Sequence, residues 1–451
     1  MDRIPVPAVL KDLSRIFTAQ GYQVYLVGGA VRDYFLGKKA EDWDIATDAK
    51  AEEVATLFKR IIPTGIEHGT VTIPFRGHMI ECTTFRIETG YTDSRHPDSV
   101  SFTATITEDL SRRDFTMNAI AAALPTGEIV DPFDGRKDIT KRIIRTVGDP
   151  HTRFSEDGLR PLRAIRFSAQ TGFTIEGPTL EAISPSIPII KTVARERIRD
   201  ELSKLLTSDN PLPALYYLEQ TGLLEHLIGE LSMCRGVFQG GRHRHDVLDH
   251  LFYTCVYCPS ASLELRLAGL FHDIGKPVAL AFDTEGNPTF HGHETVSASI
   301  TEKIMTRLKF PGKTIKAVCH LIRQHMFHYE SVWTDAAVRR FIVRTGEDEI
   351  EQLFALRRAD SRAISDIAEE GADIQELRER IIGILKQGHA FTLKDLAING
   401  HDLTSQGVPR GPVTGVILEE LMQAVLDDPS LNNRERLLDI SRAMCIERKL
   451  I

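Results

Sequence analysis

The first 140 residues alternate short strand-like runs with helical patterns. Apolar and β-branched residues that recur with a period of two are typical of half-buried strands. Such runs are YQVYLVG, WDIAT, TVTIPF, MIECTTF and SVSFTAT. Because helical patterns lie between them, we predict a mixed α+β head over residues 1–140.

Beyond residue 150 the strand pattern almost disappears. Apolar residues recur at i, i+3 and i+4 in segments such as ERIRDELSKLL and LRLAGLFHDIG, which is the spacing of an amphipathic helix. The pattern breaks near residues 180, 240 and 370, partly at glycine and proline. We therefore predict an all-α remainder, divided into a neck over residues 141–240, a domain over residues 241–368 and a C-terminal region over residues 369–451.

The composition is that of a globular protein with several domains, with 451 residues of which 42% are hydrophobic and 26% charged. No apolar run approaches the ~18 residues that a membrane span requires, and the N-terminus lacks the features of a signal peptide. The six cysteines are too scattered for a disulfide framework, and Cys255 and Cys258 lie in a helical pattern, where we expect core packing. We expect a cytoplasmic protein with reduced thiols and no membrane partner.

The net charge of −8 argues against general attraction to nucleic acid. Contacts with phosphate must therefore depend on local basic clusters. One such cluster spans residues 136–166, where nine Lys and Arg residues outnumber four acids. We predict a phosphate-handling stripe there.

Two aspartates, Asp42 and Asp44, lie in a segment with strand periodicity. Residues i and i+2 of a strand point to the same face, so we expect both carboxylates to point together while Trp43 and Ile45 point into a core. Paired carboxylates suit Mg²⁺, which proteins commonly hold through one or two carboxylates and the phosphates of a substrate. An isolated D-x-D motif, however, is also common on protein surfaces.

The segment before the aspartates gives this motif a context. A strand-like run leads into Gly28 and Gly29 and then into a helical pattern that carries Arg32. Glycine lets the backbone approach a ligand closely, and the free N–H groups of a helix start attract an anion together with an arginine. A glycine pair before a helix is also an ordinary turn, but its combination with D-x-D predicts a nucleotidyltransferase site, at which metal ions bridge a triphosphate.

Six motifs over residues 20–230 resemble, in order, those of class II tRNA nucleotidyltransferases, the CCA-adding enzymes and their poly(A) polymerase relatives. They are LVGGAVRDYFLG, DWDIATDA, ECTTFR, RRDFTMNAIA, EDGLRPLRAIRF and ERIRDEL. The resemblance implies a polymerase β-like head that adds C and A to the tRNA 3′ end from CTP and ATP, with Mg²⁺ held by the catalytic Asp42 and Asp44. The residues implied to bind the nucleotide are Gly28, Gly29, Arg32, Arg112, Arg113, Asp114, Asp157, Arg160, Arg163 and Arg166.

The motif EDGLRPLRAIRF offers a way to select bases without a template. Its spacing predicts that Asp157, Arg160 and Arg163 share one face of a helix. An aspartate accepts from the exocyclic amine of cytosine or adenine and an arginine donates to ring acceptors, so one such pair reads both bases but not G or U. The family assigns this role to the residues that match Asp157 and Arg160, with Arg163 and Arg166 in support. A salt-bridged helix face is the alternative.

Two features of the head have open alternatives. Glu81 lies in a segment that would pair with the D-x-D strand, as a third carboxylate of the site or as an exposed strand glutamate. The polar loop ETGYTDSRHPDSVSF matches a flexible element that accompanies ATP incorporation in the family. Its presence favours full CCA addition or addition of the terminal A alone, and a solvated hairpin tip is the alternative.

A second group of metal-ligand residues lies in the helical part of the chain. Imidazoles and carboxylates bind divalent transition metals, and the ordered pattern H…HD…H…H…D resembles that of the HD phosphohydrolase superfamily. The resemblance implies a site for Mn, Ni, Fe or Co that activates water against phosphoesters or cyclic phosphates. The residues are His250, His272, Asp273, His293, His325 and Asp360.

The C-terminal region resembles the helical part of the family that holds the tRNA elbow. Its loop VPRGPVTG would contact phosphates or simply connect two helices. We predict a CCA-adding tRNA nucleotidyltransferase with phosphohydrolase activity, acting as a monomer or homodimer. The alternatives are an A-adding or poly(A)-adding relative, a nucleotide or cyclic-phosphate hydrolase whose head only binds RNA, and a protein-modifying nucleotidyltransferase.

Overall fold

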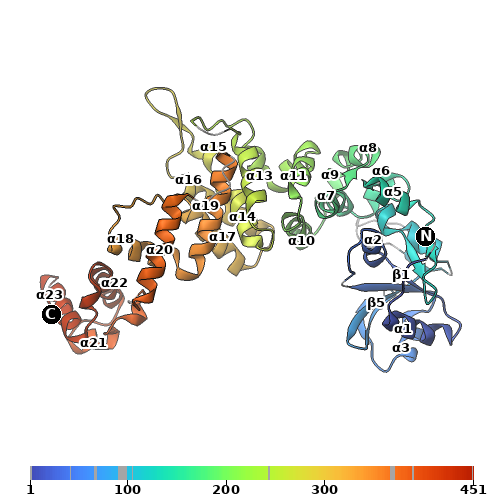
Figure 1. Ribbon diagram of the computed structural model, residues 1–451, viewed down its shortest axis with the longest axis horizontal. Coiled ribbons are helices and arrows are strands. Elements are labelled where there is room, and N and C mark those ends of the chain that lie inside the picture. The colour runs from blue at the N-terminus through green and yellow to red at the C-terminus, as the bar shows by residue number, and fades with distance from the viewer. Residues whose placement is uncertain are drawn as a thin grey trace. The chain divides into compact units, whose positions relative to one another are not determined.

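The chain forms two compact units, which Figure 1 shows in a computed structural model. Unit 1 comprises Met1–Met233 and Ile304–Phe310, and unit 2 comprises Cys234–Lys303 and Pro311–Ile451. An α+β part followed by helices confirms the predicted fold class, whereas the finer division into four domains stays a prediction. The structure describes residues 3–40, 42–65, 69–89, 99–103, 105–241, 244–365, 371–388, 391–448 and 450.

A mixed sheet forms the base of unit 1. Its strand order within the described residues is β3-β4-β5-β2-β1-β8-β9. The parallel pair β2 and β5 lies at its centre, flanked by antiparallel pairs. The strands are β1 (Val24–Val27), β2 (Trp43–Thr47), β3 (Ile62–Gly65), β4 (Thr70–Phe75), β5 (His78–Thr84), β8 (Ala121–Ala123) and β9 (Ile129–Val130), and β6 (Arg86–Thr89) pairs separately with β7 (Ser99–Phe102).

The strand-like runs in the sequence correspond to β1, β2, β4, β5 and β7, as predicted. The short helices beside the sheet are α1 (Ala8–Thr18), α2 (Gly29–Phe35) and α3 (Ala51–Leu57). In α1, the helical spacing of Leu10, Leu13 and Phe17 places all three side chains on one buried face. Strand β2 buries Ile45 and Ala46, so apolar burial fixes the strand from which Asp44 projects.

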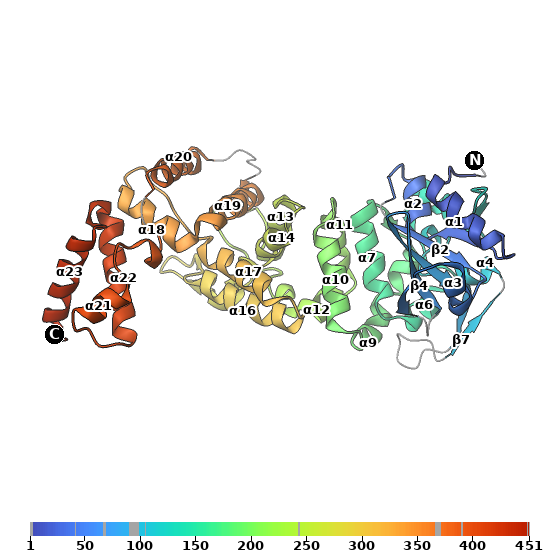
Figure 2. The same ribbon diagram turned by 90° about the horizontal axis from the view of Figure 1, so that it is seen from below.

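The rest of unit 1 is helical apart from the two-residue pair β10 (Ile143–Ile144) and β11 (Thr174–Ile175). Helix α7 lies beside α10 and α11, as Figure 2 shows, and most of its residues are buried. The helices are α4 (Ile106–Ser111), α5 (Gly135–Lys141), α6 (Pro150–Glu156), α7 (Arg160–Thr171), α8 (Gly177–Glu181), α9 (Ile187–Ile190), α10 (Arg195–Leu206), α11 (Pro211–Gln220) and α12 (Leu223–Ser232).

Unit 2 is built from helices and one short hairpin, β12 (Ala281–Phe282) and β13 (Pro288–Thr289). Helix α13 packs against α14 and α19, and α14 packs against α17. The helices are α13 (Val247–Tyr257), α14 (Leu263–Phe271), α15 (Lys276–Ala279), α16 (His293–Arg307), α17 (Gly312–Gln324), α18 (Asp335–Thr345), α19 (Ile350–Ser365), α20 (Ala372–Lys386), α21 (Gly400–Ser405), α22 (Pro412–Asp427) and α23 (Arg434–Glu447).

The prediction drawn from the cysteines agrees with the fold. All six cysteines are buried and none forms a disulfide, including Cys255 and Cys258 on and after α13. None of the helices in the described part of the chain combines the length and the hydropathy that crossing a bilayer requires.

Candidate active site

A cavity of about 400 Å³ opens in unit 1, lined by residues from the sheet, from α2 and from α7. It brings together most of the site residues predicted from the sequence, which are spread along the chain from Gly28 to Arg163. Asp42 and Arg166 are not among the lining residues. Those that line it are Gly28, Gly29, Arg32, Asp44, Glu81, Arg112, Arg113, Asp114, Asp157, Arg160 and Arg163.

The acidic side of the cavity comes from the two parallel strands. The β2–β5 register places Asp44 directly opposite Glu81, and neighbouring residues in this register project to the same face of the sheet. Burial raises the pKa of Asp44, and the negative charge of Asp42 adds to this against the opposing effect of Arg113. Burial and the charge of Asp44 likewise raise the pKa of Glu81.

Asp42 itself precedes β2 and is exposed. Of its apolar neighbours, Ile45 is buried as predicted, but Trp43 is only half-buried, with its ring centroid 4.6 Å from that of His78. The prediction that Trp43 points into a core was therefore wrong, because β2 begins at the rim of the sheet where its first residue is incompletely covered.

The oxygens of the three carboxylates are hard ligands of the kind that Mg²⁺ prefers. Desolvation is the main cause of the raised pKa of Asp44 and of Glu81, and neighbouring negative charge adds to it, so a bound cation would favour the ionised form of both. Among the described residues, Asp42, Asp44 and Glu81 are not one of the groups whose ligand atoms all lie within 4.8 Å. The oxygen donors fit Mg²⁺ by their chemistry alone, and the phosphates of a substrate would have to serve as further ligands.

A glycine bend lies beside the acidic residues. Gly28 has a φ of 69° and precedes α2, which starts at Gly29. A Cβ atom on Gly28 would lie 3.0 Å from Nη1 of Arg113 and 3.7 Å from Oδ2 of Asp44. Both the backbone angle and the close approach therefore require glycine at this position.

Arg32 lies in the first turns of α2 and is buried. Its guanidinium donates to Asp33 Oδ1 at 2.9 and 2.8 Å and to Asn118 Oδ1 at 2.8 Å. These contacts fix the cation in place at the cavity wall, as an anion-binding site requires.

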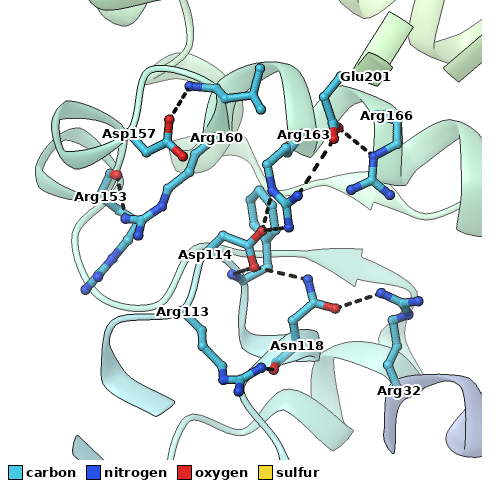
Figure 3. Close-up of polar contacts among 12 residues, drawn as sticks. Arg32, Arg113, Asp114, Asn118, Arg153, Asp157, Arg160, Arg163, Arg166 and Glu201 are labelled. Carbon is cyan, nitrogen blue, oxygen red and sulfur yellow. Dashed lines mark hydrogen bonds and ion pairs between the residues drawn. The ribbon is translucent and has the colours of Figure 1, made fainter. Parts of the chain in front are cut away.

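Asp114 is the centre of a buried polar chain, which Figure 3 shows. Its Oδ2 accepts from Nε and Nη2 of Arg163 at 2.8 and 2.6 Å, and its Oδ1 accepts from Nδ2 of Asn118 at 3.1 Å. Burial opposes ionisation, but the charge of Arg163 and the hydrogen bond from Asn118 prevail and lower the pKa of Asp114 to about 2. Because Asn118 also accepts from Arg32, the chain connects α7 with α2.

Two residues that contact this buried polar chain or belong to it were not predicted from the sequence. Asn118 lies in the quoted motif RRDFTMNAIA and Glu201 in ERIRDEL, but nothing in their local pattern indicates a role. Glu201 on α10 is buried and accepts from Nε of Arg166 at 2.7 Å, and its other oxygen lies 3.8 Å from Nη1 of Arg163.

Arg166 does not line the cavity. Besides pairing with Glu201, its guanidinium lies 3.6 Å from the ring centroid of Phe167. Arg112 and Arg113 reach the cavity from the end of α4, where Asp109 lies 2.8 Å from Nη2 of Arg112 and 3.6 Å from Nη2 of Arg113.

The basic residues of segment 136–166 do not form one continuous phosphate-facing surface. Arg160 and Arg163 line the cavity, but Arg145 pairs with Asp138 and Glu176 at 3.1 and 2.8 Å. The charge count alone did not reveal these pairs, because one partner, Glu176, lies outside the counted segment.

The prediction that Asp157 shares one face of a helix with Arg160 and Arg163 was wrong. Asp157 ends α6 with φ −140° and ψ 111°, and α7 begins at Arg160. The break includes Gly158, where a Cβ atom would lie 2.9 Å from the carbonyl oxygen of Ile189. The three side chains nevertheless line the same cavity.

The loop quoted for ATP incorporation lies largely outside the described residues, since residues 90–98 are not described. The loop VPRGPVTG leads from α21 to α22. A cavity of about 320 Å³ beside it is lined by His401, Thr404 and Arg410 together with Thr414.

The six predicted ligands of the second site converge in unit 2. They come from α13 (His250), the end of α14 (His272 and Asp273), the start of α16 (His293), the end of α17 (His325) and α19 (Asp360), and all are buried. Asp273 and Asp360 link the imidazoles: Nε2 of His293 and of His325 lie 3.0 and 3.5 Å from Asp273 Oδ1. Nε2 of His250 lies 3.1 Å from Asp360 Oδ1 and 3.1 Å from Nε2 of His272.

The ligand atoms form two overlapping groups within 4.8 Å, His250 with His272 and Asp273, and Asp273 with His293 and His325. Burial opposes ionisation of Asp273, but His272 and the ammonium of Lys276, 2.6 Å from its Oδ2, hold its pKa well below the ordinary range. An imidazole–carboxylate set of this kind fits a divalent transition metal.

Comparison with known proteins identifies related families. The model named "Poly A polymerase head domain" matches residues 24–145, that of a "probable RNA and SrmB-binding site of polymerase A" matches residues 172–234, and that of "tRNA nucleotidyltransferase domain 2" matches residues 295–440. A CCA-adding enzyme of Levilactobacillus brevis is 36% identical over 422 residues, which is 93% of each chain. A CCA-adding enzyme of Geobacillus stearothermophilus is 33% identical over 92% of each chain.

A solved structure is similar over nearly the whole chain. It is the Bacillus stearothermophilus CCA-adding enzyme in complex with CTP, which has 30% identity and a TM-score of 0.75 and covers 98% of this chain and 99% of its own. The structure of a CCA-adding enzyme in its apo form II, at 21% identity and a TM-score of 0.62, shares the same fold.

Proposed function

This chain belongs to the family of CCA-adding enzymes, and we propose that its cavity binds CTP and ATP while the 3′ end of a tRNA is extended. As a member of this family it is a tRNA nucleotidyltransferase. The observation that carries the proposal is the cavity itself, because it joins an acidic strand pair, a glycine bend and a polar base-reading turn around one space.

The residues near α2 and β2 would bind the reactive end of the nucleotide. We assign the triphosphate to Gly28, Gly29 and Arg32, because Arg32 is held at the cavity wall and the bend leaves no side chain in the way. Asp42 and Asp44, with Glu81 beside them, would hold Mg²⁺. When bound, Mg²⁺ would neutralise charge on the triphosphate and acidify the tRNA 3′ hydroxyl.

The remaining cavity residues would orient the nucleotide. Arg112, Arg113 and Asp114 lie where ribose and phosphates would pass, and Arg163 is fixed by Asp114. Asp157 and Arg160 would read the base, Asp157 by accepting from the exocyclic amine and Arg160 by donating to a ring nitrogen or carbonyl. Arg166 would act indirectly, by orienting Glu201 next to Arg163. Holding both reactants in this way supplies much of the acceleration through positioning.

Substitution of the acidic pair tests the assignment. We expect Asp44→Ala and Asp42→Ala each to abolish nucleotide incorporation, by at least about 10³-fold, because the Mg²⁺ that would compensate the charge of the reacting phosphates is no longer held. Binding of tRNA, measured by filter retention, should not change. Incorporation of labelled CTP or ATP into truncated tRNA is the measurement.

Asp48→Ala is the matched control, since Asp48 lies after β2 and accepts from the backbone N–H of Gln23 rather than lining the cavity. It should keep full activity. Persisting incorporation by the Asp44→Ala protein would refute the assignment. The same assay with tRNA lacking its three terminal nucleotides, tRNA ending in CC and an unrelated RNA separates CCA addition from A addition or polyadenylation. We also propose a cytoplasmic location, where tRNA and nucleoside triphosphates are found.

We further propose a phosphohydrolase activity for the second site. The observation that favours it is the convergence of six buried metal-ligand side chains from five helices. A bound Mn, Ni, Fe or Co ion would activate water for attack on a phosphoester or cyclic phosphate. Lys276, beside Asp273, would neutralise negative charge at the site.

Metal content provides the test of the second site. We expect the wild-type protein to retain a divalent transition metal after dialysis, and His272→Ala combined with Asp273→Ala to lose it. Hydrolysis of bis(p-nitrophenyl) phosphate should disappear in the same variant. His291→Ala, at an exposed position two residues before His293, is the control and should behave as wild type. Equal metal content in all three proteins would exclude the site.

A further inference from the structure

A buried glutamine, Gln239, lies beside the metal-ligand cluster of unit 2. Its side chain is only 8% exposed, although glutamine is mostly found at protein surfaces. It belongs to the short segment 236–241 between α12 and α13. A buried carboxamide has to find partners for both its oxygen and its nitrogen, because burial removes the hydrogen bonds that each made to water.

The segment that carries Gln239 is fixed to the start of α13. The backbone N–H of Gly236 donates to Asp246 Oδ2 at 2.7 Å, and Phe238 forms an isolated antiparallel bridge with Asp246. Asp246 is the N-cap of α13, the helix that carries His250. Because successive residues of an extended chain point to opposite sides, Phe238 is exposed while Gln239 is buried.

Lys276 determines which way the carboxamide of Gln239 faces. Oε1 of Gln239 accepts from Nζ of Lys276, and the same Nζ lies 2.6 Å from Oδ2 of Asp273. An ammonium group can only donate, so the oxygen of the carboxamide has to face it and the nitrogen has to point elsewhere. Asp273 belongs to both groups of potential metal ligands. The carboxamide is therefore two hydrogen bonds away from a residue at the centre of the second site.

The nitrogen of the same carboxamide is unpaired. Nε2 of Gln239 is buried and has no hydrogen-bond acceptor among the residues that the structure describes. Turning the carboxamide over would not help, because Nε2 would then meet the donors of Lys276. An unpaired buried donor costs free energy, and native proteins rarely keep one without a reason such as a ligand. A non-bridging phosphate oxygen is a strong acceptor and suits this donor.

We propose that Gln239 is a substrate-binding residue of the phosphohydrolase site, and that its Nε2 donates to a non-bridging oxygen of the phosphoester. The inference rests on the proposed phosphohydrolase function and adds a residue that binds the substrate rather than the metal. Lys276 holds the carboxamide in this orientation through Oε1. Because Gln239 is neutral, it supplies a donor without changing the charge of the ligand cluster.

Two variants separate the two ends of the carboxamide. Gln239→Glu has nearly the same shape and still accepts from Lys276, but an ionised carboxylate cannot donate to phosphate. Gln239→Met can neither accept nor donate. We expect both variants to raise KM for bis(p-nitrophenyl) phosphate by at least about tenfold, since a hydrogen bond to a charged group is lost, with a smaller effect on kcat. The inhibition constant of inorganic phosphate should rise in parallel.

Metal content after dialysis and the thermal unfolding midpoint accompany the kinetics. Both should stay at the wild-type value, because none of the six metal-ligand side chains is replaced. Gln387→Glu is the matched control, with the same change of charge at an exposed position at the end of α20, and should keep the wild-type KM. If Gln239 serves only to hold Lys276, Gln239→Glu will also keep the wild-type KM, and that result overturns the inference. Metal loss that accounts for the lost activity would overturn it too.

Calorimetric titration of the metal-loaded proteins with inorganic phosphate separates this inference from the function on which it rests. Weaker phosphate binding by both Gln239 variants supports the inference, whether or not hydrolysis is detected. If the wild type hydrolyses the ester and Gln239→Glu matches it in KM and in phosphate binding, the inference alone is wrong. If the wild type neither hydrolyses the ester nor binds phosphate, the proposed phosphohydrolase function is wrong and the role of Gln239 with it.

Discussion

At the scale of single residues, Asp114 and Asn118 connect the part of the cavity assigned to phosphates with the part assigned to the base. Asp114 contacts Arg163 on α7, and Asn118 contacts both Asp114 and Arg32 on α2. A short, fully paired chain of this kind rigidifies a site, because no member can rotate without leaving a buried polar atom unpaired.

The ion pair of Asp114 makes stability depend on acid pH. The pKa of Asp114 is about 2 in the folded protein and near 3.8 for an ordinary aspartate. Because the folded value is the lower one, the contribution to stability, about 2 kcal/mol, is fully present above pH 4 and is lost as the pH falls toward 2. We expect the difference in unfolding free energy between the wild type and Asp114→Asn to be largest at pH 5 and clearly smaller at pH 3, as measured by urea denaturation.

Arg163 is freed of its partner in the Asp114→Asn variant, so a constant loss of stability is expected at all pH values in addition. Only the pH-dependent part of the difference in unfolding free energy reports on the lowered pKa of Asp114. A difference between the two proteins that is the same at pH 5 and pH 3 would show that Asp114 has an ordinary pKa in the folded chain.

At the scale of elements, the break between α6 and α7 depends on Gly158. A Cβ atom there would lie 2.9 Å from the carbonyl oxygen and 3.0 Å from Cγ2 of Ile189, which is part of α9. Backbone oxygen cannot move aside cheaply, so we expect Gly158→Ala to shift the turn and cost about 1–3 kcal/mol. A lower thermal midpoint together with a weaker preference for CTP over UTP is the expected result.

Gly177→Ala is a suitable comparison for Gly158→Ala. Gly177 starts α8, and a Cβ atom there would meet nothing within 4 Å. This exchange should be neutral or slightly stabilising, because alanine restricts the unfolded chain. If Gly158→Ala unfolds at the same temperature as Gly177→Ala, the close approach to Ile189 is not a constraint.

The elements also show how much can be predicted from sequence. Alternating β-branched and apolar residues predicted β1, β2, β4 and β5, and the motifs predicted most cavity residues. Strand β8 consists of three alanines and carries no strand signal, since its extended form depends on pairing with β1 and β9. The α6–α7 break, the pairing of Asp157 with Arg197 and the role of Asn118 arise from contacts between distant segments, which periodicity does not encode.

At the scale of the whole molecule, the two candidate sites belong to different compact units. The cavity lies within unit 1 and the six-ligand cluster within unit 2. Each core contains the residues that fix its own site, so the two proposed activities should be separable.

We therefore expect each variant to lose one activity and to keep the other. Asp44→Ala should lose nucleotide addition and keep phosphodiester hydrolysis, while His272→Ala with Asp273→Ala should do the reverse. Both activities are to be measured in one preparation of each protein, with circular dichroism as a check on folding. Loss of both activities in either variant would show that the sites depend on each other.

The alignment of Asp44 with Glu81 has a consequence for how sequences of this family can diverge during evolution. Their relative position is set by the ladder between β2 and β5, not by the length of the polypeptide that joins them. Between Thr47 and His78, insertions and deletions outside α3, β3 and β4 can thus accumulate at the surface, provided that the ladder keeps its register. A slip by a single position would turn Glu81 to the opposite face, so selection should tolerate changes of length between these elements and act strictly on the paired strands.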